Sequence, residues 1–176
     1  MADEQKKTLE ALRIAVQMEI DGKEFYIKSS QASSNKLGKN LLQSLAKAED
    51  AHRLRFIQLY EAVRDKNAWP KAITKPKAAK DLKTVFSAAT EKMAARTEPL
   101  ASELEAVQTA MKMESKTFDF YSARAAKTGS DTEKGFYKAI AAEERQHHLA
   151  LADYQEFLKN PAGWFVKHEH PSIDGG

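Results

Sequence analysis

An internal repeat is the feature of this sequence that most limits how the chain can fold. The segment MEIDGKEFY at residues 18–26 returns as MESKTFDFY at residues 113–121. AEDAH at residues 48–52 is likewise matched by AEERQHH at residues 142–148. Three pairs of residues are each separated by 95 positions: Glu19 and Glu114, Glu49 and Glu144, and His52 and His147. Because one offset relates both pairs of segments, a unit that contains two segments is written twice.

The periodicity of the apolar residues predicts that each unit is a pair of helices. Apolar residues recur at three- and four-residue spacing in four runs, at about 9–26, 41–63, 100–125 and 131–158. The chain has only 7 Gly and 5 Pro, and Ala, Leu, Lys, Glu and Gln dominate it. Ser130 and Glu133 in SDTE predict a capping box at the start of the fourth helix. The fold class is therefore all-α, a four-helix bundle of two repeated helical hairpins.

A long connection is expected between the hairpins. We predict one bundle over residues 1–160, with a crossover connection at about 68–97 and a C-terminal tail at 161–176. The connection has a weaker helical pattern around 82–93 and is long enough to cross the bundle, so the second and third helices could run parallel. Its five lysines between 71 and 83 are interpreted as a solvated linker in preference to a docking surface for an acidic electron carrier.

The C-terminal tail is expected to be structural, and the composition argues against several classes of protein. Trp164 and Phe165 are expected to anchor the tail, and His168 and His170 to lie in its solvated end in preference to binding a metal. A net charge of +3 does not argue for nucleic acid, and no apolar run is long enough to span a membrane. The polar N-terminus lacks a signal core. With no cysteine, the chain cannot hold disulfides or iron–sulfur clusters, and a cytoplasmic location is expected.

The repeated glutamates and histidines predict a site with two metal ions. Residues three apart on a helix share a face, so Glu49 and His52 converge, as do Glu144 and His147. Packing the hairpins about a pseudo-twofold axis would add Glu19 and Glu114 and bring four carboxylates and two imidazoles together. Two divalent cations would balance four carboxylate charges that otherwise repel one another in a low-dielectric core.

The donor set indicates which metals and which roles to expect. Oxygen-rich ligation with one nitrogen per metal suits iron or manganese, and zinc could occupy the same site. We expect Glu49 and Glu144 to bridge the metals, and Glu19 and Glu114 to be terminal ligands. A single Glu-x-x-His is more often a solvated pair, but two of them at one common offset favour the metal site.

Neighbouring residues are weaker candidates. Tyr26 and Tyr121 lie two turns beyond the terminal glutamates, where they could hydrogen-bond a ligand, donate an electron or simply pack in the core. His148 and Glu143 lie off the ligand face and are expected to meet a neighbouring helix or solvent.

These motifs resemble the rubrerythrin branch of the ferritin-like superfamily over nearly the whole chain. The resemblance rests on MEIDGKEFY, AEDAH, MESKTFDFY and AEERQHH, and more loosely on the tail. It implies a ferritin-like four-helix bundle with a non-haem di-iron centre that reacts with hydrogen peroxide or dioxygen. The catalytic and metal-binding residues it implies are Glu19, Glu49, His52, Glu114, Glu144 and His147.

Two departures from that family change the expectation. The chain has no cysteine for a rubredoxin module, so electrons would come from an external donor such as a separate rubredoxin-like protein. Where the family usually has an extra glutamate this chain has Thr117, whose equivalent in the first half is Gly22, which leaves room for a small oxidant.

The leading functional interpretation is an oxidoreductase with two iron ions per chain that reduces hydrogen peroxide, or dioxygen. A ferroxidase or iron-handling protein is the first alternative, and a structural dimetal site is the second. A homodimer is expected in preference to a closed ferritin shell, because no fifth helix for lining a pore is evident after the fourth.

Overall fold

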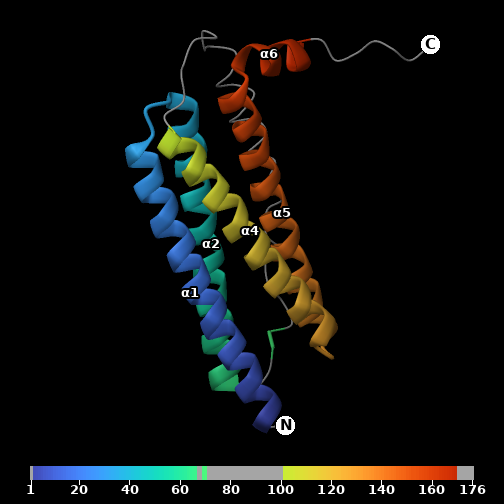
Figure 1. Cartoon of the computed structure of the whole chain (residues 1–176). Helices are drawn as coiled ribbons and strands as arrows, with labels where there is room; N and C mark the ends of the chain where they lie inside the picture. The colour runs from blue at the N-terminus through green and yellow to red at the C-terminus, as the bar shows by residue number, and fades with distance from the viewer. Residues whose placement is uncertain (1, 67–68, 71–100, 170–176) are drawn as a thin grey trace, which may run out of the picture.

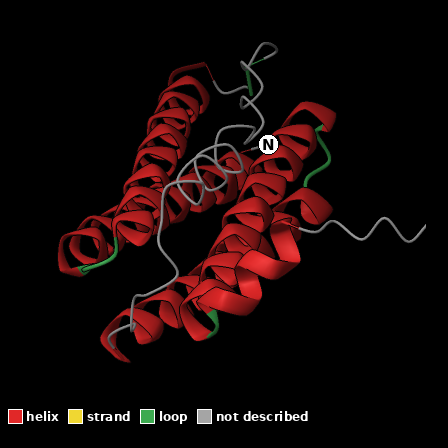
Figure 2. Ribbon diagram, turned by 90° about the horizontal axis from the view of Figure 1, so that it is seen from above, coloured by secondary structure: helices red, strands yellow, loops and turns green. Residues whose placement is uncertain are grey.

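The protein is an all-α bundle of two antiparallel helical hairpins (Figure 1). The computed structural model describes residues 2–66, 69–70 and 101–169. Its helices are α1 (Ala2–Ala32), α2 (Lys36–Lys66), α4 (Ala101–Lys127), α5 (Asp131–Lys159) and α6 (Pro161–Glu169). The described segments are helices joined by short loops (Figure 2). The predicted helical patch at 82–93 and the lysines between 71 and 83 lie outside the described residues.

The observed helices are longer than their apolar patterns. α1 begins seven residues before Leu9 and continues six residues past Tyr26, and α2 begins five residues before Leu41. These outer turns are mostly polar and rich in Lys, Glu and Gln, which favour helix, although Leu37 in the first turn of α2 is buried in the core. Periodicity therefore marks most of the packed part of each helix but does not locate its ends.

The two hairpins pack with α2 and α4 running in the same direction (Figure 1). α1 and α2 contact each other along their length, as do α4 and α5. Between the hairpins, α1 meets α4 and α2 meets α5. This arrangement confirms the predicted hairpin repeat and the parallel second and third long helices.

Two apolar clusters fill the bundle, one toward each end. The first includes Leu12, Ala15, Phe56, Leu59, Val63, Tyr121, Ala125, Phe136, Tyr137, Ile140 and Ala141. The second includes Tyr26, Leu37, Leu41, Leu42, Leu45, Ala46, Val107, Ala110, Leu151, Tyr154, Phe157, Leu158 and Trp164. On every long helix the chain passes from one cluster to the other through a middle segment, and that segment carries the repeated glutamates and histidines.

A buried carboxylate ties the first hairpin turn to the second hairpin. Asn35 caps α2, because its side-chain oxygen accepts a hydrogen bond from the backbone N–H of Leu37 at 2.9 Å. Beside this turn, Glu103 on α4 accepts hydrogen bonds from the hydroxyls of Ser33 and of Tyr154 on α5. One side chain therefore holds three parts of the bundle together at this end.

The turn between α4 and α5 contains only half of the predicted capping box. The Ser130 hydroxyl accepts a hydrogen bond from the backbone N–H of Glu133, as expected for an N-cap. The Glu133 carboxylate accepts instead from the hydroxyl of Thr128 at 2.7 Å, and the Thr128 hydroxyl accepts from the Ser130 N–H. The Thr128 hydroxyl thus lies between the Ser130 N–H and the Glu133 carboxylate, which would bond directly in a capping box, because a hydroxyl can both donate and accept.

The first part of the predicted tail is a short helix, so the expectation that no further helix follows the fourth long one is wrong. α6 begins directly after Asn160, whose side chain accepts a hydrogen bond from the N–H of Gly163. Pro161 suits the first helical position, where an N–H would be unused. Trp164 is buried against Phe157, so the predicted apolar anchor is present. His168 lies on α6, and residues 170–176 are outside the described range.

Among the helices that the structure describes, none has the length and apolar character of a membrane span.

Gly38 provides a test of the packing at the Glu103 end of the bundle, and Gly135 provides the control. A Cβ at Gly38 would overlap the hydroxyl of Tyr154 and lie 2.7 Å from a carboxylate oxygen of Glu103, whereas a Cβ at Gly135 on α5 would meet nothing within 4 Å. Gly38→Ala should lower the free energy of unfolding by about 1–3 kcal/mol through overpacking. Gly135→Ala should raise it by about 0.5–1 kcal/mol, because alanine favours helix. Chemical denaturation measures both changes in the free energy of unfolding. If Gly38→Ala left that free energy unchanged, the close approach of α2 to Tyr154 on α5 and Glu103 on α4 would be contradicted.

Candidate metal centre

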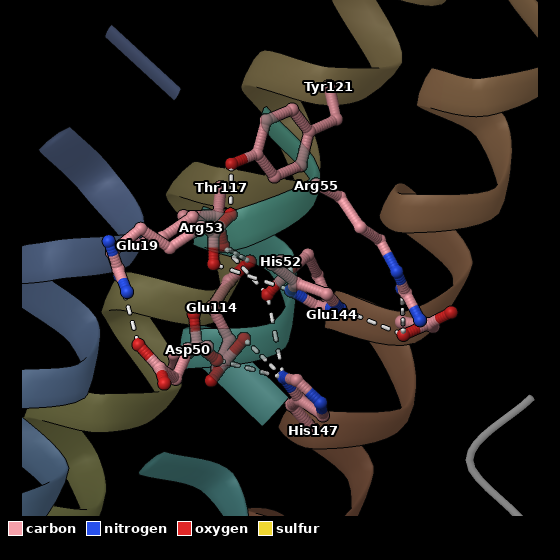
Figure 3. A network of polar contacts seen from close by, with 12 residues as sticks. Glu19, Asp50, His52, Arg53, Arg55, Glu114, Thr117, Tyr121, Glu144 and His147 are labelled. Atoms are coloured by element: carbon pink, nitrogen blue, oxygen red, sulfur yellow. Dashed lines mark hydrogen bonds and ion pairs between the residues drawn. The ribbon is translucent and has the colours of Figure 1, made fainter. Parts of the chain in front are cut away.

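The six predicted ligands meet at mid-length in the bundle, between the two apolar clusters. α1 and α4 each contribute one glutamate, while α2 and α5 each contribute a glutamate and a histidine one turn later. The six residues are Glu19, Glu49, His52, Glu114, Glu144 and His147. All are between 0% and 3% exposed. Figure 3 shows those that it labels pointing toward one another from the four helices.

These residues form two overlapping groups of candidate metal ligands. The first group is Glu19, Glu49, His52 and Glu144, and the second is Glu49, Glu114, Glu144 and His147. Within each group the ligand atoms all lie within 4.8 Å of one another. Glu49 and Glu144 belong to both groups, which is the arrangement expected of bridging carboxylates. Glu19 and Glu114 each belong to one group, as expected of terminal ligands.

Both imidazoles present Nδ1 to the carboxylates. His52 Nδ1 lies 3.3 Å from Glu19 and 3.1 Å from Glu144. His147 Nδ1 lies 3.2 Å from Glu49, 3.5 Å from Glu114 and 3.6 Å from Glu144. The two rings stack with centroids 5.6 Å apart. Each histidine therefore serves one of the two groups.

The unsatisfied atoms of the site fit a pair of metal ions. Each of the six residues has one buried oxygen or nitrogen that no hydrogen bond within the described chain satisfies. Buried polar atoms are nearly always paired, so six orphans facing one another need an external partner. Carboxylate oxygens with neutral imidazole nitrogen, and no thiolate, suit iron or manganese. Two divalent ions would also balance the charge of four ionised carboxylates.

Two tyrosines hold the terminal glutamates from the opposite hairpin. Tyr26 on α1 donates a hydrogen bond to Glu114 on α4, and Tyr121 on α4 donates one to Glu19 on α1 (Figure 3 shows the second). Burial, followed by the nearby carboxylate charges, raises the pKa of both phenols well above the usual value. Both hydroxyls therefore stay protonated and serve as donors. Of the roles considered for these residues, both hydrogen bonding to a ligand residue and packing in the core are observed.

Glu143 has a contact with a ligand residue that the sequence did not predict. Its carboxylate lies off the ligand face, as predicted, but accepts from Nε2 of His52 at 2.8 Å. Arg55 Nη1 lies 3.8 Å from the same oxygen. A carboxylate on the far nitrogen orients a ligand imidazole and increases its basicity. The equivalent of Glu143 in the first half is Ala48, so the repeat contains no signal for it.

Three other residues border the site. Nδ1 of His148 approaches the backbone oxygen of Met111 on α4 at 3.2 Å, so His148 faces a neighbouring helix, as predicted. The Thr117 hydroxyl donates to Glu144 at 3.3 Å. A Cβ at the equivalent Gly22 would lie 3.2 Å from a carboxylate oxygen of Glu49. Thr117 and Gly22 occupy the two positions where an extra glutamate was considered from the sequence. Each lies next to one of the glutamates that belong to both ligand groups, Thr117 beside Glu144 and Gly22 beside Glu49.

The carboxylates differ in charge when no metal neutralises them. Burial raises the pKa of Glu49 well above its ordinary value, and repulsion from the other three carboxylates raises it further. Burial also raises the pKa of Glu114 to about 8, against the opposing charge of His147. Burial alone would raise the pKa of Glu144, but contacts with His147 and His52 hold it well below the ordinary range.

The imidazoles carry the compensating protons. Burial by itself would lower the pKa of His52, but contacts with Glu143, Glu144 and Glu19 outweigh it and raise the pKa well above the usual value. The pKa of His147 is raised in the same way, with the charge of Glu114 leading the opposing contacts. In the absence of metal, protons on these groups therefore take the place of cations.

Comparisons with known proteins agree with this geometry. Neither the curated proteins nor the solved structures contain a match to the chain. The family model described as Rubrerythrin matches residues 10–154, a range that spans both hairpins and all six candidate ligands. The chain therefore belongs to the rubrerythrin family.

Proposed function

We propose that this protein is a non-haem di-iron oxidoreductase that reduces hydrogen peroxide, or dioxygen, with electrons from an external donor. One observation carries the proposal: two candidate ligand groups share Glu49 and Glu144 in the middle of a buried layer. Family membership supports the same interpretation. Two iron ions bound there would supply the two electrons that, with two protons, reduce one hydrogen peroxide to two molecules of water.

The residues around the ligands would keep the donor set in place. Tyr26 and Tyr121 each orient a terminal glutamate through one hydrogen bond, and Glu143 orients the ring of His52. All the proposed ligands are anchored on packed helices with an apolar cluster on each side. Ligands whose rotamers are locked by packing and by outer hydrogen bonds need little rearrangement when the charge of the site changes.

We propose that the electrons come from another protein. The 176 residues contain no cysteine that could hold an iron–sulfur or rubredoxin-type centre. We propose a separate rubredoxin-like donor in the cytoplasm and a homodimeric protein. Large apolar side chains on the outer faces, including Leu54 and Leu149, are 48% and 46% exposed and would be available to a second copy.

Removing a shared glutamate should empty the site without unfolding the protein. The wild-type protein should bind about two metal ions per chain. Glu49→Gln and Glu144→Gln should each lower the metal content sharply. Glu49→Gln should leave the free energy of unfolding of the metal-free protein unchanged or higher, because it removes a member of a repelling group. Elemental analysis and denaturation measure the two effects.

Glu103→Gln is the matched control, since Glu103 is also buried but lies at the end of the bundle with two hydroxyl donors. Its metal content should equal that of the wild type. Unchanged metal content in both Glu49→Gln and Glu144→Gln would disprove the ligand assignment.

The stability of the metal-free protein should fall as the pH rises. The pKa values of Glu49, Glu114 and both histidines are raised on folding, so the folded state binds more protons than the unfolded state between the ordinary glutamate pKa and about 8. The lowered pKa of Glu144 acts in the opposite direction but only below that window. The melting temperature should therefore drop by at least about 3 °C from roughly pH 5.5 to pH 8, the shift that about 1 kcal/mol produces in a chain of this size.

Metal should oppose this loss of stability at higher pH. Ligands must lose their protons to bind a cation, so metal affinity increases with pH. The melting temperature of the metal-loaded protein should exceed that of the metal-free protein by more at pH 8 than at pH 5.5. A metal-free protein that becomes more stable toward pH 8 would contradict the charges assigned to the site.

Anaerobic single-turnover experiments test the function itself. The iron(II)-loaded protein is mixed with one equivalent of hydrogen peroxide, and separately with air, and followed optically. Fast oxidation by peroxide, with one peroxide consumed per two irons, is the expected result. Light scattering on the same samples should find a small assembly. A particle of several hundred kilodaltons that takes up far more than two irons per chain would favour iron storage instead.

A further inference from the structure

A crevice between α4 and α5 adjoins the candidate metal centre. It has a volume of about 190 Å³, and the buried carboxylates Glu114 and Glu144 form part of its lining. Ser115 and Phe118 on α4 face Arg145 and His148 on α5 along its walls. Ser115 and Arg145 are exposed, so the crevice opens at the surface. A water molecule occupies about 30 Å³ in the liquid, so several molecules of that size fit.

The first hairpin has ion pairs at the equivalent place. The repeat relates Phe118 to Lys23, Arg145 to Asp50 and His148 to Arg53. Lys23 Nζ contacts Asp50 Oδ1 at 2.8 Å, and Arg53 Nε contacts the same oxygen at 2.9 Å (Figure 3 shows Asp50 and Arg53). These side chains link α1 to α2 across the surface next to Glu19 and Glu49. The two hairpins therefore hold equivalent ligands, but the surface next to the ligands has a crevice between α4 and α5 and ion pairs between α1 and α2.

The lining of the crevice suits a small, neutral molecule that forms hydrogen bonds. Ser115 and His148 supply a hydroxyl and an imidazole, and their atoms lie 3.3 Å apart. Arg145 and Asp119, which both line the crevice, bring charges of opposite sign. An ion of either sign would therefore meet repulsion as well as attraction, whereas hydrogen peroxide can donate to and accept from these groups.

We propose that the crevice between α4 and α5 is the route by which hydrogen peroxide reaches the centre, and that the ion pairs of Lys23, Asp50 and Arg53 close the equivalent route between α1 and α2. This inference rests on the proposed function of the site. Access is then one-sided although the ligands are arranged symmetrically. Ser115 stands at the mouth and sets its width.

A matched pair of variants tests the route. Ser115→Phe places a ring in the mouth of the crevice, and Ile20→Phe places the same ring at the equivalent position of the first hairpin. Ser115→Ala removes the hydroxyl without filling the space. For the iron(II)-loaded protein under anaerobic conditions, nitric oxide is the neutral probe, and its association rate constant is measured by stopped-flow absorbance. For the iron(II)-loaded protein, the rate of oxidation by peroxide is measured. Circular dichroism and metal content confirm that each variant is folded and loaded.

Ser115→Phe should slow both nitric oxide association and peroxide oxidation by about tenfold, a factor that corresponds to about 1.4 kcal/mol of added barrier. Ile20→Phe and Ser115→Ala should stay close to the wild type. If Ser115→Phe does not fold, Ser115→Leu takes its place. Equal rates in the two phenylalanine variants, with a reactive wild type, would overturn the route and leave the proposed function intact. A loaded wild type that does not react with peroxide would instead overturn the function.

Discussion

The charge buried at the centre of the bundle is the constraint on which the rest of the structure depends. Four carboxylates and two imidazoles lie between two apolar clusters, and all six are almost fully shielded from water. Taking a charged group out of water costs several kcal/mol even after the protein relaxes. Such a layer is tolerated only when cations, or protons in their absence, neutralise it. The apolar clusters on both sides supply the burial free energy that holds the four helices around it.

The sequence predicts the centre well because the centre is built from helices. A helix converts a spacing of three residues into a shared face, so the sequence alone is enough to pair Glu49 with His52 and Glu144 with His147. The common offset of 95 positions then places Glu19 and Glu114 in register with them. The fold follows from the same pattern, since two repeated hairpins with polar residues at mid-helix can bury those residues only by facing each other.

The remaining features depend on contacts between helices that no local pattern encodes. The sequence places Tyr26 two turns from Glu19, yet its hydrogen bond goes to Glu114 on the other hairpin. Glu143 lies off the ligand face of its own helix but meets His52 on α2. Pro161 and Gly163 favour an irregular tail in the sequence, although both are compatible with the first turn of the helix α6 that is observed there. The lining of the crevice is likewise set by side chains from two helices.

The crevice in one hairpin and the ion pairs at the equivalent place in the other have a consequence for how such a centre can evolve. Two identical hairpins on separate chains, paired about a true twofold axis, would have to carry every substitution twice. An ion pair that shielded one metal position would shield the other as well, and an opening on one side would be repeated on the opposite side. When both hairpins belong to one chain, Asp50 and Arg145 can diverge while Glu49 and Glu144 remain the same. Two hairpins within one chain therefore free the surroundings of the metals from the symmetry that the ligands themselves obey.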